Sequence, residues 1–432
     1  MVKSDSARKL DTSNNSKCVI IFSALLLLLV VGFGSSPYYF LSLFRIYARR
    51  LTHPPYNYNT PGAARRLADG RTEYDLIVVT DLDHDSKLKD GKTWQSILLK
   101  GILRVAPNYE RMEVEWDGKE RLLRSQFAMG GRAMELSDLA FFDGHVLSVD
   151  DRTGIVYKIV NDREIIPWIF LNDGSGNTAK GFKGEWMAVR DELLYVGGLG
   201  KEWTTPEGVF LNHNPMYVKI VTPSGEITHV NWVENYKALR RAANITAPGG
   251  YMIFESAQWS EIHQRWFFLP RRVSNETYSE TSDEFQGSNL MLVADDHFAN
   301  VEVREVGGPR GDGSRGFSAF QFLPGSADRV IVALKSQERD GVAVATFITA
   351  FDVHTGRTLL DETAISGEPH KTSELRSLNC SIREKQRQTS QRTWEFPNEP
   401  SISPLSVTSS WARPLKDAVV EDLGLPLRLL RT

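Results

Sequence analysis

The amino-acid sequence predicts an all-β fold built from repeated units. From residue 73 onward, short apolar runs rich in β-branched and aromatic residues alternate with turn signals such as Asp-Gly, Ser-Gly and Thr-Gly. Runs of this length between such turns are typical of β-strands. Long amphipathic patterns are scarce, and residues 232–245 form the clearest helical candidate.

An internal repeat narrows this fold class. The segments that begin at Glu135/Ser137, Glu185, Glu255 and Ser318 each run through an apolar strand to a turn and return on a second strand. Their starts are roughly 50 to 70 residues apart, the scale of one four-stranded propeller blade with insertions. With an earlier unit over residues 75–99, the repeat predicts a five-bladed β-propeller over residues 73–366.

The N-terminus predicts a membrane segment. Residues 1–17 are mostly polar, and residues 18–44 contain no charge and have an apolar centre from Val19 to Phe33. Aromatic residues extend this centre toward the roughly 20 residues that span a bilayer. We predict a cytoplasmic tail over 1–17 and a signal anchor over 18–44. A cleaved signal peptide is the alternative, because small residues follow the apolar run, and basic residues on both sides leave the orientation open.

Residues 45–72 are rich in Pro, Tyr, Asn and Arg and are predicted to form a stem. The two cysteines, Cys18 and Cys380, exclude a disulfide framework and a cysteine-based zinc site. Glycosylation triplets at Asn244, Asn275 and Asn379 agree with a lumenal domain. The net charge of −3 gives no reason to expect a nucleic-acid partner.

The last segment breaks the strand pattern. After about Gly367 the sequence is rich in Ser, Arg, Gln and Pro, without alternating strands. Such composition predicts a largely disordered tail over residues 367–432.

The repeated glutamates and serines are the strongest chemical signal. The innermost strands of a propeller line its axis, so residues repeated at their starts converge there. Carboxylate and hydroxyl oxygens in such a position suit Ca²⁺ or Mg²⁺. The alternative is that these residues end strands and bond to nearby backbone groups.

Other polar strand ends form a second group. Cations there would hold phosphates while a carboxylate orients water. For SVDDRTG, Ser148 to Gly154, the simpler interpretation is a turn closed by glycine. The group comprises Asp81, Asp83, the SVDDRTG segment, Lys201, Trp203, Arg271, Arg272 and Lys335.

Together the motifs resemble those of the calcium-activated nucleotidases, or apyrases, over about residues 74–363. The resemblance is densest at VTDLD, RAMELSDL, SVDDRTGIVY, GFKGEWMAV, YVGGLGKEWTT, FESAQWS, RWFFLPRR, GFSAFQFLP and IVALKS. It implies a five-bladed propeller with a central calcium site. It also implies hydrolysis of nucleoside di- and triphosphates, with UDP and GDP favoured.

The resemblance also implies roles for individual residues. The calcium set would be Ser137, Asp138, Glu185, Glu255 and Ser318. Catalytic, water-orienting roles would fall to Asp81, Asp83 and Asp151, and substrate-binding roles to Arg152, Lys201 and Trp203.

The chain departs from the family pattern at two places. The segment after Gly367 replaces a final strand that carries a further calcium-site glutamate in the family, and no residue there matches it convincingly. Met216 stands where relatives commonly carry an acidic residue, which is expected to alter substrate contacts.

We therefore expect a membrane-anchored ER or Golgi enzyme whose catalytic domain is lumenal. Its expected activity is Ca²⁺-dependent hydrolysis of nucleoside diphosphates, supporting glycosylation by clearing UDP. If the N-terminus is cleaved, a secreted apyrase acting on ADP and ATP is the better interpretation. The alternative from another class is a non-catalytic calcium-binding propeller, or a variant made inactive by the altered C-terminus, and a homodimer is left open.

Overall fold

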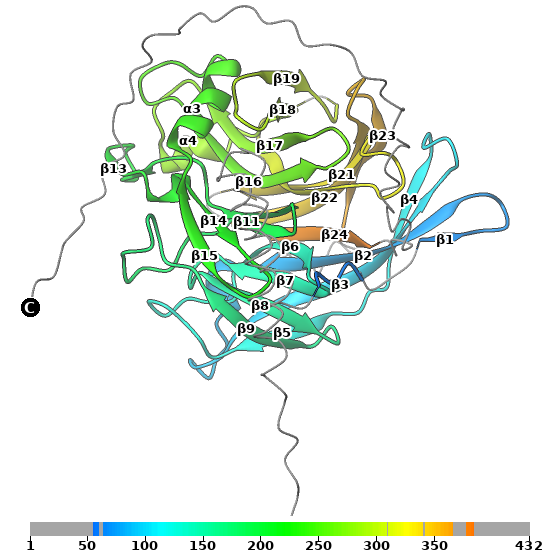
Figure 1. Ribbon diagram of the computed structural model, residues 1–432, viewed down its shortest axis with the longest axis horizontal. Helices are drawn as coiled ribbons and strands as arrows, with labels where there is room; N and C mark the ends of the chain where they lie inside the picture. Colours follow the sequence, from blue (N-terminus) through cyan, green and yellow to red (C-terminus); the bar gives the residue numbers. More distant parts are fainter. Residues whose placement is uncertain (1–54, 60–63, 309, 340–341, 366–376, 384–432) are drawn as a thin grey trace, which may run out of the picture. The chain divides into compact units, whose positions relative to one another are not determined.

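The protein is a five-bladed β-propeller. The structure, a computed structural model, describes residues 55–59, 64–308, 310–339, 342–365 and 377–383. These residues belong to one compact unit of the chain, residues 1–387. They form five large antiparallel sheets that are arranged as blades (Figure 1). The predicted fold class and number of blades are confirmed.

Four blades are meanders in which four strands pair in chain order. Blade 2 contains β6 (Leu136–Phe142), β7 (His145–Asp150), β8 (Ile155–Val160) and β9 (Glu164–Phe170). Blade 3 contains β10 (Trp186–Arg190), β11 (Leu193–Gly197), β14 (Tyr217–Val221) and β15 (Ile227–Asn231). Blade 4 contains β16 (Tyr251–Ser260), β17 (Arg265–Ser274), β18 (Leu290–Ala294) and β19 (Val301–Glu305). Blade 5 contains β20 (Arg315–Phe322), β21 (Val330–Arg339), β22 (Val342–Asp352) and β23 (Thr358–Ala364).

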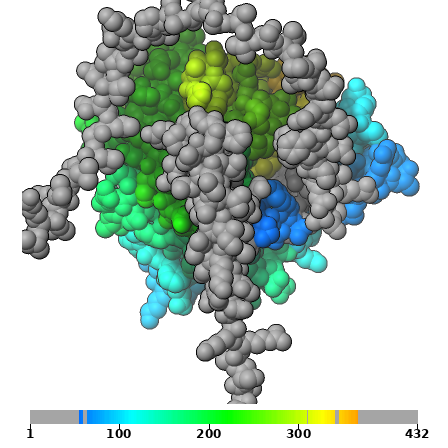
Figure 2. Space-filling model, viewed as in Figure 1, coloured from blue at the N-terminus to red at the C-terminus, as the bar shows by residue number. Residues whose placement is uncertain are grey.

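Blade 1 combines strands from both ends of the described chain. Figure 2 shows its blue and cyan ends, β1 and β4, at one edge of the molecule. The blade contains β1 (Arg65–Arg66), β2 (Thr72–Asp81), β3 (Trp94–Val105), β4 (Met112–Trp116), β5 (Arg121–Ser125) and β24 (Ser377–Arg383).

Strand β24 corrects the expectation of a tail without strands after Gly367. It pairs antiparallel with β2 along Asp75–Asp81 and lies beside β2 in Figure 1. It also lies next to β6 and β20, which completes a ring of inner strands in the order β6, β10, β16, β20, β24. Without it, the inner edge of β2 would present unpaired backbone groups, so closure of the ring favours a strand despite the polar sequence. Residues 366–376 and 384–432 lie outside the described residues.

Removing β24 is expected to lower the thermal unfolding midpoint by more than about 10 °C. The deletion takes away seven paired residues and the contacts of β24 with β6 and β20. Each kcal/mol lost shifts the midpoint of a large domain by about 2–4 °C. Calorimetry on chains that end at residue 366 and at residue 387 measures the effect. Equal midpoints would show that β24 does not close the ring.

The hydrophobic core lies between neighbouring blades. Side chains alternate between the two faces of a strand. Leu76 and Val78 of β2 therefore pack against blade 5, whereas Ile77 and Val79 pack against blade 2. The other clusters join blades 2 and 3, 3 and 4, and 4 and 5 in the same way. Alternating apolar strands thus hold each blade to both neighbours.

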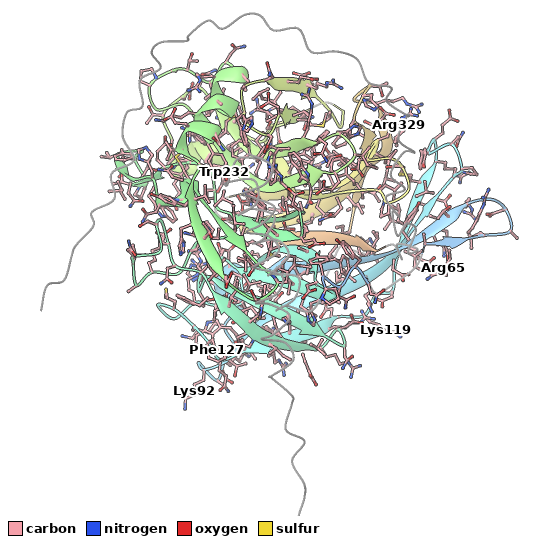
Figure 3. The ribbon with its side chains drawn as sticks, viewed as in Figure 1. Arg65, Lys92, Lys119, Phe127, Trp232 and Arg329 are labelled. Carbon is pink, nitrogen blue, oxygen red and sulfur yellow. The ribbon has the colours of Figure 1, made fainter. Side chains whose placement is uncertain are left out.

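Large aromatic side chains fill the interface between blades 3 and 4. The rings of Trp232 and Trp266 meet edge to face with centroids 5.4 Å apart, and Figure 3 shows Trp232 among the strands. Gly197 has to be glycine, because a Cβ there would lie 2.0 Å from the ring of Trp186. Met216 belongs to the same cluster and is fully buried. Its expected effect on substrate contacts is therefore not supported by its position.

Helices are few among the described residues. The predicted helix is present as α3 (Val233–Ala242), after β15. The other helical elements are α4 (Glu280–Asp283) and the 3₁₀ turns η1 (Asp83–Ser86) and η2 (Asn214–Met216). A short hairpin, β12 (Trp203–Thr204) and β13 (Phe210–Asn212), projects from blade 3.

None of the helices in the described part of the chain has the length and apolar character to cross a membrane. The predicted anchor, residues 18–44, lies outside the described residues. Of the glycosylation triplets, Asn244 and Asn275 are exposed in loops, whereas Asn379 lies within the paired strand β24.

Candidate active site

The turn after β7 gives two neighbouring aspartates different roles. The carboxylate of Asp150 accepts hydrogen bonds from the Arg152 N–H at 3.0 Å, from the Met134 N–H at 2.9 Å and from Thr153 Oγ1 at 2.8 Å. The N–H of Gly154, at φ +73°, donates to the Asp150 carbonyl at 2.9 Å and closes the turn. Asp150 therefore builds the turn. The side chains of Asp151 and Arg152 contact residues that precede other strands.

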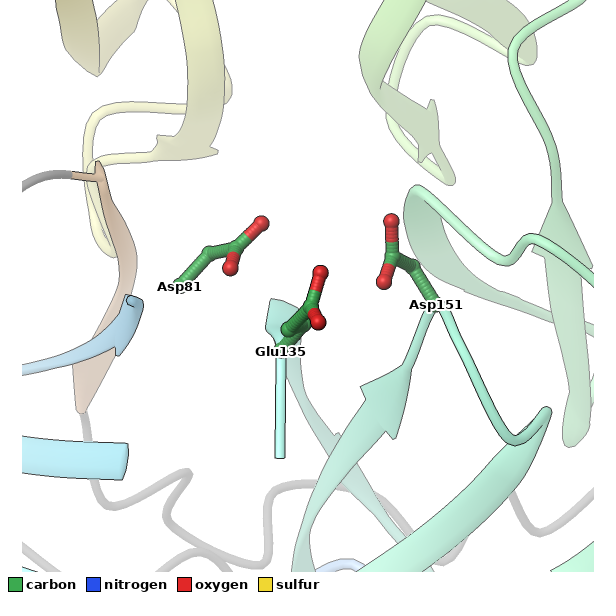
Figure 4. A group of neighbouring side chains, drawn as sticks. All are labelled: Asp81, Glu135 and Asp151. Atoms are coloured by element: carbon green, nitrogen blue, oxygen red, sulfur yellow. The ribbon is translucent and has the colours of Figure 1, made fainter. Parts of the chain in front are cut away.

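Asp151 lies in a group of three carboxylates. Asp81 comes from the end of β2 and Glu135 immediately precedes β6. One oxygen of each side chain lies within 4.8 Å of the others, close enough to share a metal ion. Figure 4 shows the three carboxylates pointing toward one another. Asp83 adjoins the group, because its N–H donates to Asp81 Oδ1 at 2.8 Å.

Three cations surround these carboxylates. Arg132 donates to both oxygens of Glu135, at 2.6 and 2.5 Å, and reaches Asp83 Oδ1 at 3.0 Å. Arg152 Nε donates to Glu135 Oε2 at 2.6 Å. Lys183 Nζ contacts Asp151 Oδ2 and lies 2.9 Å from Glu185 Oε1. The site can therefore hold phosphate groups as well as positive ions.

Asp151 Oδ1 is the unsatisfied atom of the group. It is buried without a hydrogen-bond partner, and the nearest cation, Arg152 Nε, lies 3.5 Å away. A buried carboxylate oxygen without a hydrogen bond costs free energy, so such an atom in a polar cluster indicates a position for a ligand or a reacting water.

Burial raises the pKa values of several carboxylates of the site, and the excess of neighbouring negative charge adds to the shift. Burial and then the neighbouring carboxylates raise the pKa of Asp81 well above its usual range and also raise the pKa of Glu135. Burial raises the pKa of Glu185 to about 8. The nearby cation Lys183 opposes this rise, and the carboxylates Glu255 and Asp151 add to it. Burial alone would lower the pKa of Arg152, but Asp151 and Glu135 raise it overall. A bound cation would relieve this excess.

The predicted calcium set lies on adjacent inner strands. Ser137 is on β6, Glu185 immediately precedes β10, Glu255 is on β16 and Ser318 is on β20. The pairing register shifts at Ser137, beside Glu255 and at Ser318, so the inner strand leaves its ladder at each of these positions. Such irregularities re-aim side chains and are common beside active sites. The donor set is made of hard oxygens, which fits Ca²⁺.

Glu255 already has a strong partner. Glu255 accepts hydrogen bonds from Arg271 Nη1 at 2.6 Å on both oxygens. Arg271 also contacts Glu338, which Arg272 reaches at 3.0 Å. Burial nevertheless raises the pKa of Glu255. The arginines therefore compensate part of the charge that a metal ion would otherwise balance.

Asp138 differs from the rest of its set. Its Oδ1 accepts from the Leu139 N–H and its Oδ2 from the Met187 N–H, both at 2.7 Å. The bond from Met187 joins β10 to β6 beside the site. The contacts thus support a positioning role, and a metal-binding role of Asp138 stays a prediction.

Lys201 and Trp203 lie on the hairpin side of the site. Lys201 Nζ donates to Thr204 Oγ1 at 2.8 Å and to the Glu202 carbonyl at 3.0 Å. Burial lowers the pKa of Lys201 to about 8. Lys180 Nζ lies 4.0 Å from the ring centroid of Trp203, whose buried N–H has no hydrogen-bond partner. Neither residue directly contacts the three carboxylates.

The structure places Asp81, Asp83, Asp151 and Arg152 close together. It adds partners that the sequence pattern did not single out. Arg132 and Lys183 stand two or three positions before repeated glutamates, and that spacing is the signal that would have found them. Lys335 is a structural cation, since it is buried and donates to Glu362 at 2.7 Å and to Asn289 at 2.6 Å.

Comparisons with known proteins point to one family. A family model described as Apyrase matches residues 82–373. The Caenorhabditis elegans apyrase apy-1 is 49% identical over 72% of this chain and 85% of its own length. The mouse soluble calcium-activated nucleotidase 1 is 49% identical over 74% of this chain and 78% of its own length. The apyrase of Cimex lectularius is 44% identical over 70% and 81%.

Among solved structures, the Nup133 β-propeller domain of Vanderwaltozyma polyspora covers 71% of this chain and 98% of its own length. Its TM-score of 0.29 and identity of 9% are too low to bear on function. The family match extends over more than half of the chain, and the relatives are similar along most of their lengths. The chain belongs to the apyrase family.

Proposed function

We propose that this protein hydrolyses nucleoside di- and triphosphates to release inorganic phosphate, in a Ca²⁺-dependent reaction. The observation that carries the proposal is the group formed by Asp81, Glu135 and Asp151, with Arg132, Arg152 and Lys183 around it. Hydrolysis of a phosphoanhydride requires carboxylates that can accept a proton from water, next to cations that can hold phosphate. The names of the apyrase and nucleotidase relatives support the same activity.

Ser137, Glu185, Glu255 and Ser318 would hold Ca²⁺, since they supply hard oxygen donors from four adjacent inner strands. The burial of Glu185 and its repulsion by Glu255 and Asp151, which raise its pKa although Lys183 lies beside it, support a further cation there. When bound, Ca²⁺ would supply positive charge that offsets the charge of the substrate phosphates.

The protein side chains would carry the proton and orient the reactants. The oxygen of a water attacks the terminal phosphorus, the bond to the bridging oxygen breaks, and the nucleotide leaves with that oxygen. Asp151 Oδ1, which is buried without a hydrogen bond, would accept the water proton. Asp81 and Asp83 would orient the water, and Arg152 and Lys201 would stabilise charge on the phosphates.

We further propose that the catalytic domain works in the lumen of the secretory pathway or outside the cell. Exposed glycosylation triplets at Asn244 and Asn275 support this location. A role in clearing UDP during glycosylation follows if UDP is the main substrate. The membrane anchor over residues 18–44 and a homodimer stay predictions.

The test is phosphate release from UDP, GDP and ADP by the full chain with Ca²⁺, with Mg²⁺ and with a chelator. We expect release with Ca²⁺ and a loss to background with chelator that added Ca²⁺ restores. If Ca²⁺ raises the thermal midpoint but none of the nucleotides is hydrolysed, the protein is a calcium-binding propeller without this activity. Equal rates with and without chelator would contradict calcium dependence.

A further inference from the structure

The guanidinium of Arg271 lies between two carboxylates that come from neighbouring blades. Its Nη1 donates to both oxygens of Glu255 on β16 at 2.6 Å, and its Nη2 donates to Glu338 on β21. The side chain of Arg271 is only 11% exposed, so little water reaches it in place of either carboxylate. One cation therefore serves a residue of the proposed calcium set and a residue outside that set.

The backbone around Arg271 fits this bridging position. The pairing of β21 with β22 shifts its register between Gln337 and Glu338, and such a bulge re-aims the side chain beside it. Gly316 on β20 has to be glycine, because a Cβ there would lie 2.2 Å from the carbonyl oxygen of Arg271 and 2.7 Å from its Cγ. Blades 4 and 5 thus leave room for the arginine and bring Glu338 to it.

Arg271 and Ca²⁺ would compete for the negative charge of Glu255. Calcium affinity follows the number and charge of the oxygen ligands, and a cation held on a ligand carboxylate lowers the charge that it offers. Glu338 draws on the same arginine, because Arg271 is the main cause that holds the pKa of Glu338 below its usual range. At Glu255, burial keeps the pKa raised in spite of Arg271. Arg271 therefore compensates the charge of Glu255 only in part.

A second arginine fixes Glu338 in its place. Arg272 Nη2 donates to Glu338 Oε2 at 3.0 Å, while Arg271 occupies Oε1. The Nε of Arg272 lies 3.8 Å from Asp283 Oδ2. Within the described chain, Asp283 forms its ion pair with Arg272 and not with Arg271. The network therefore contains two carboxylates outside the calcium set, of which only Glu338 holds Arg271.

We propose that Glu338 is a positioning residue of the calcium site, because it holds one nitrogen of Arg271 and so leaves the oxygens of Glu255 available to Ca²⁺. Without the charge of Glu338, the whole charge of Arg271 would fall on Glu255, and Ca²⁺ would meet a stronger competitor. Indirect partners of this kind are worth about 10–100-fold in metal affinity. This inference rests on the proposed function, which places Glu255 in the calcium set.

The test is calorimetric titration of Ca²⁺ into the full chain, without nucleotide, after a chelator has removed divalent cations. Glu338→Gln keeps the size of the side chain and removes its charge, and we expect it to weaken Ca²⁺ binding about 10-fold. The side chain of Glu338 is 30% exposed, so water can hydrate the new amide and the fold is retained. Unchanged or tighter Ca²⁺ binding would overturn the proposal.

Asp283→Asn is the matched control, since it removes a carboxylate of the same network that pairs with Arg272 alone. It is expected to leave the Ca²⁺ dissociation constant within about twofold of wild type, and a loss equal to that of Glu338→Gln would reduce Glu338 to a structural role.

Glu338→Asp provides a second variant, which decides the matter if Glu338→Gln does not fold. It keeps the charge but draws the carboxylate back from Arg271 by one methylene. We expect Ca²⁺ binding about threefold weaker than in wild type, and binding equal to that of Asp283→Asn would contradict the proposal.

Calcium binding is measured without hydrolysis, so the two proposals are judged separately. If wild type binds Ca²⁺ but releases no phosphate from any nucleotide, weaker binding in Glu338→Gln would uphold the role of Glu338 while the hydrolase proposal fails. If hydrolysis depends on Ca²⁺ while Glu338→Gln binds Ca²⁺ like wild type, the proposed function stands and the role of Glu338 is wrong. Absence of Ca²⁺ binding in wild type would overturn both.

Discussion

Replacing Glu185 with glutamine is expected to shift the Ca²⁺ concentration for half-maximal activity upward by at least about 100-fold. The substitution keeps the size of the side chain but removes its negative charge. Calcium affinity follows the number and charge of the oxygen ligands, and even indirect partners of a metal ion are worth about 10–100-fold. Glu185 is nearly fully buried, so water does not readily replace the lost carboxylate.

Two measurements separate a metal role of Glu185 from a structural one. The rise of the thermal midpoint with Ca²⁺ reports binding without catalysis, and we expect Glu185→Gln to lose it at concentrations that saturate wild type. Glu302→Gln, on the outer strand β19, is the matched control and should retain normal calcium activation. An unchanged calcium midpoint in Glu185→Gln would remove Glu185 from the ligand set.

The repeat of strands and turns is sufficient to predict the propeller, and the reason is physical. Every blade has to bury both faces of its strands, so apolar residues point alternately to the two neighbouring blades. In β2, Leu76 and Val78 face one neighbour, and Ile77 and Val79 face the other. The repeat also aligns one Glu or Ser on, or immediately before, each of the inner strands β6, β10, β16 and β20. Ser137, Glu185, Glu255 and Ser318 could therefore be proposed as a set before any geometry was known.

The features that could not be predicted from the sequence depend on contacts between residues that lie far apart in the chain. Strand β24 carries a short alternation, with Leu378, Cys380 and Ile382 as its apolar positions, but it is only seven residues long and lies in a polar segment. It forms where β2 offers an unpaired edge, between β6 and β20. The side chains of Arg132 and Lys183 are ordinary surface types, and only the buried carboxylates opposite them make these cations part of the site. Such partners become visible when strands distant in sequence are brought together.

The neighbours Asp150 and Asp151 provide the sharpest test of the catalytic assignment. Asp151→Asn is expected to lower kcat by about 10²–10⁴, the range that general acid–base catalysis contributes, with KM changed less than about threefold. The amide keeps the shape of the side chain and cannot accept the proton of the attacking water at Oδ1. Its thermal midpoint should stay within a few degrees of wild type, because the amide oxygen can still accept from Lys183 in place of Oδ2 and Oδ1 makes no hydrogen bond in the folded protein.

Asp150→Asn is expected to give the opposite pattern, because the two carboxylates serve different purposes. Asp150 accepts hydrogen bonds from Met134, Arg152 and Thr153, and an amide nitrogen in place of one oxygen would oppose a donor in a buried turn. An unsatisfied buried donor costs about 1–3 kcal/mol, which lowers the thermal midpoint by several degrees. Phosphate-release kinetics and calorimetry on both variants decide the matter. If Asp151→Asn retains kcat within tenfold of wild type, the proton acceptor is another carboxylate of the group, and Asp81→Asn becomes the variant that should lose activity.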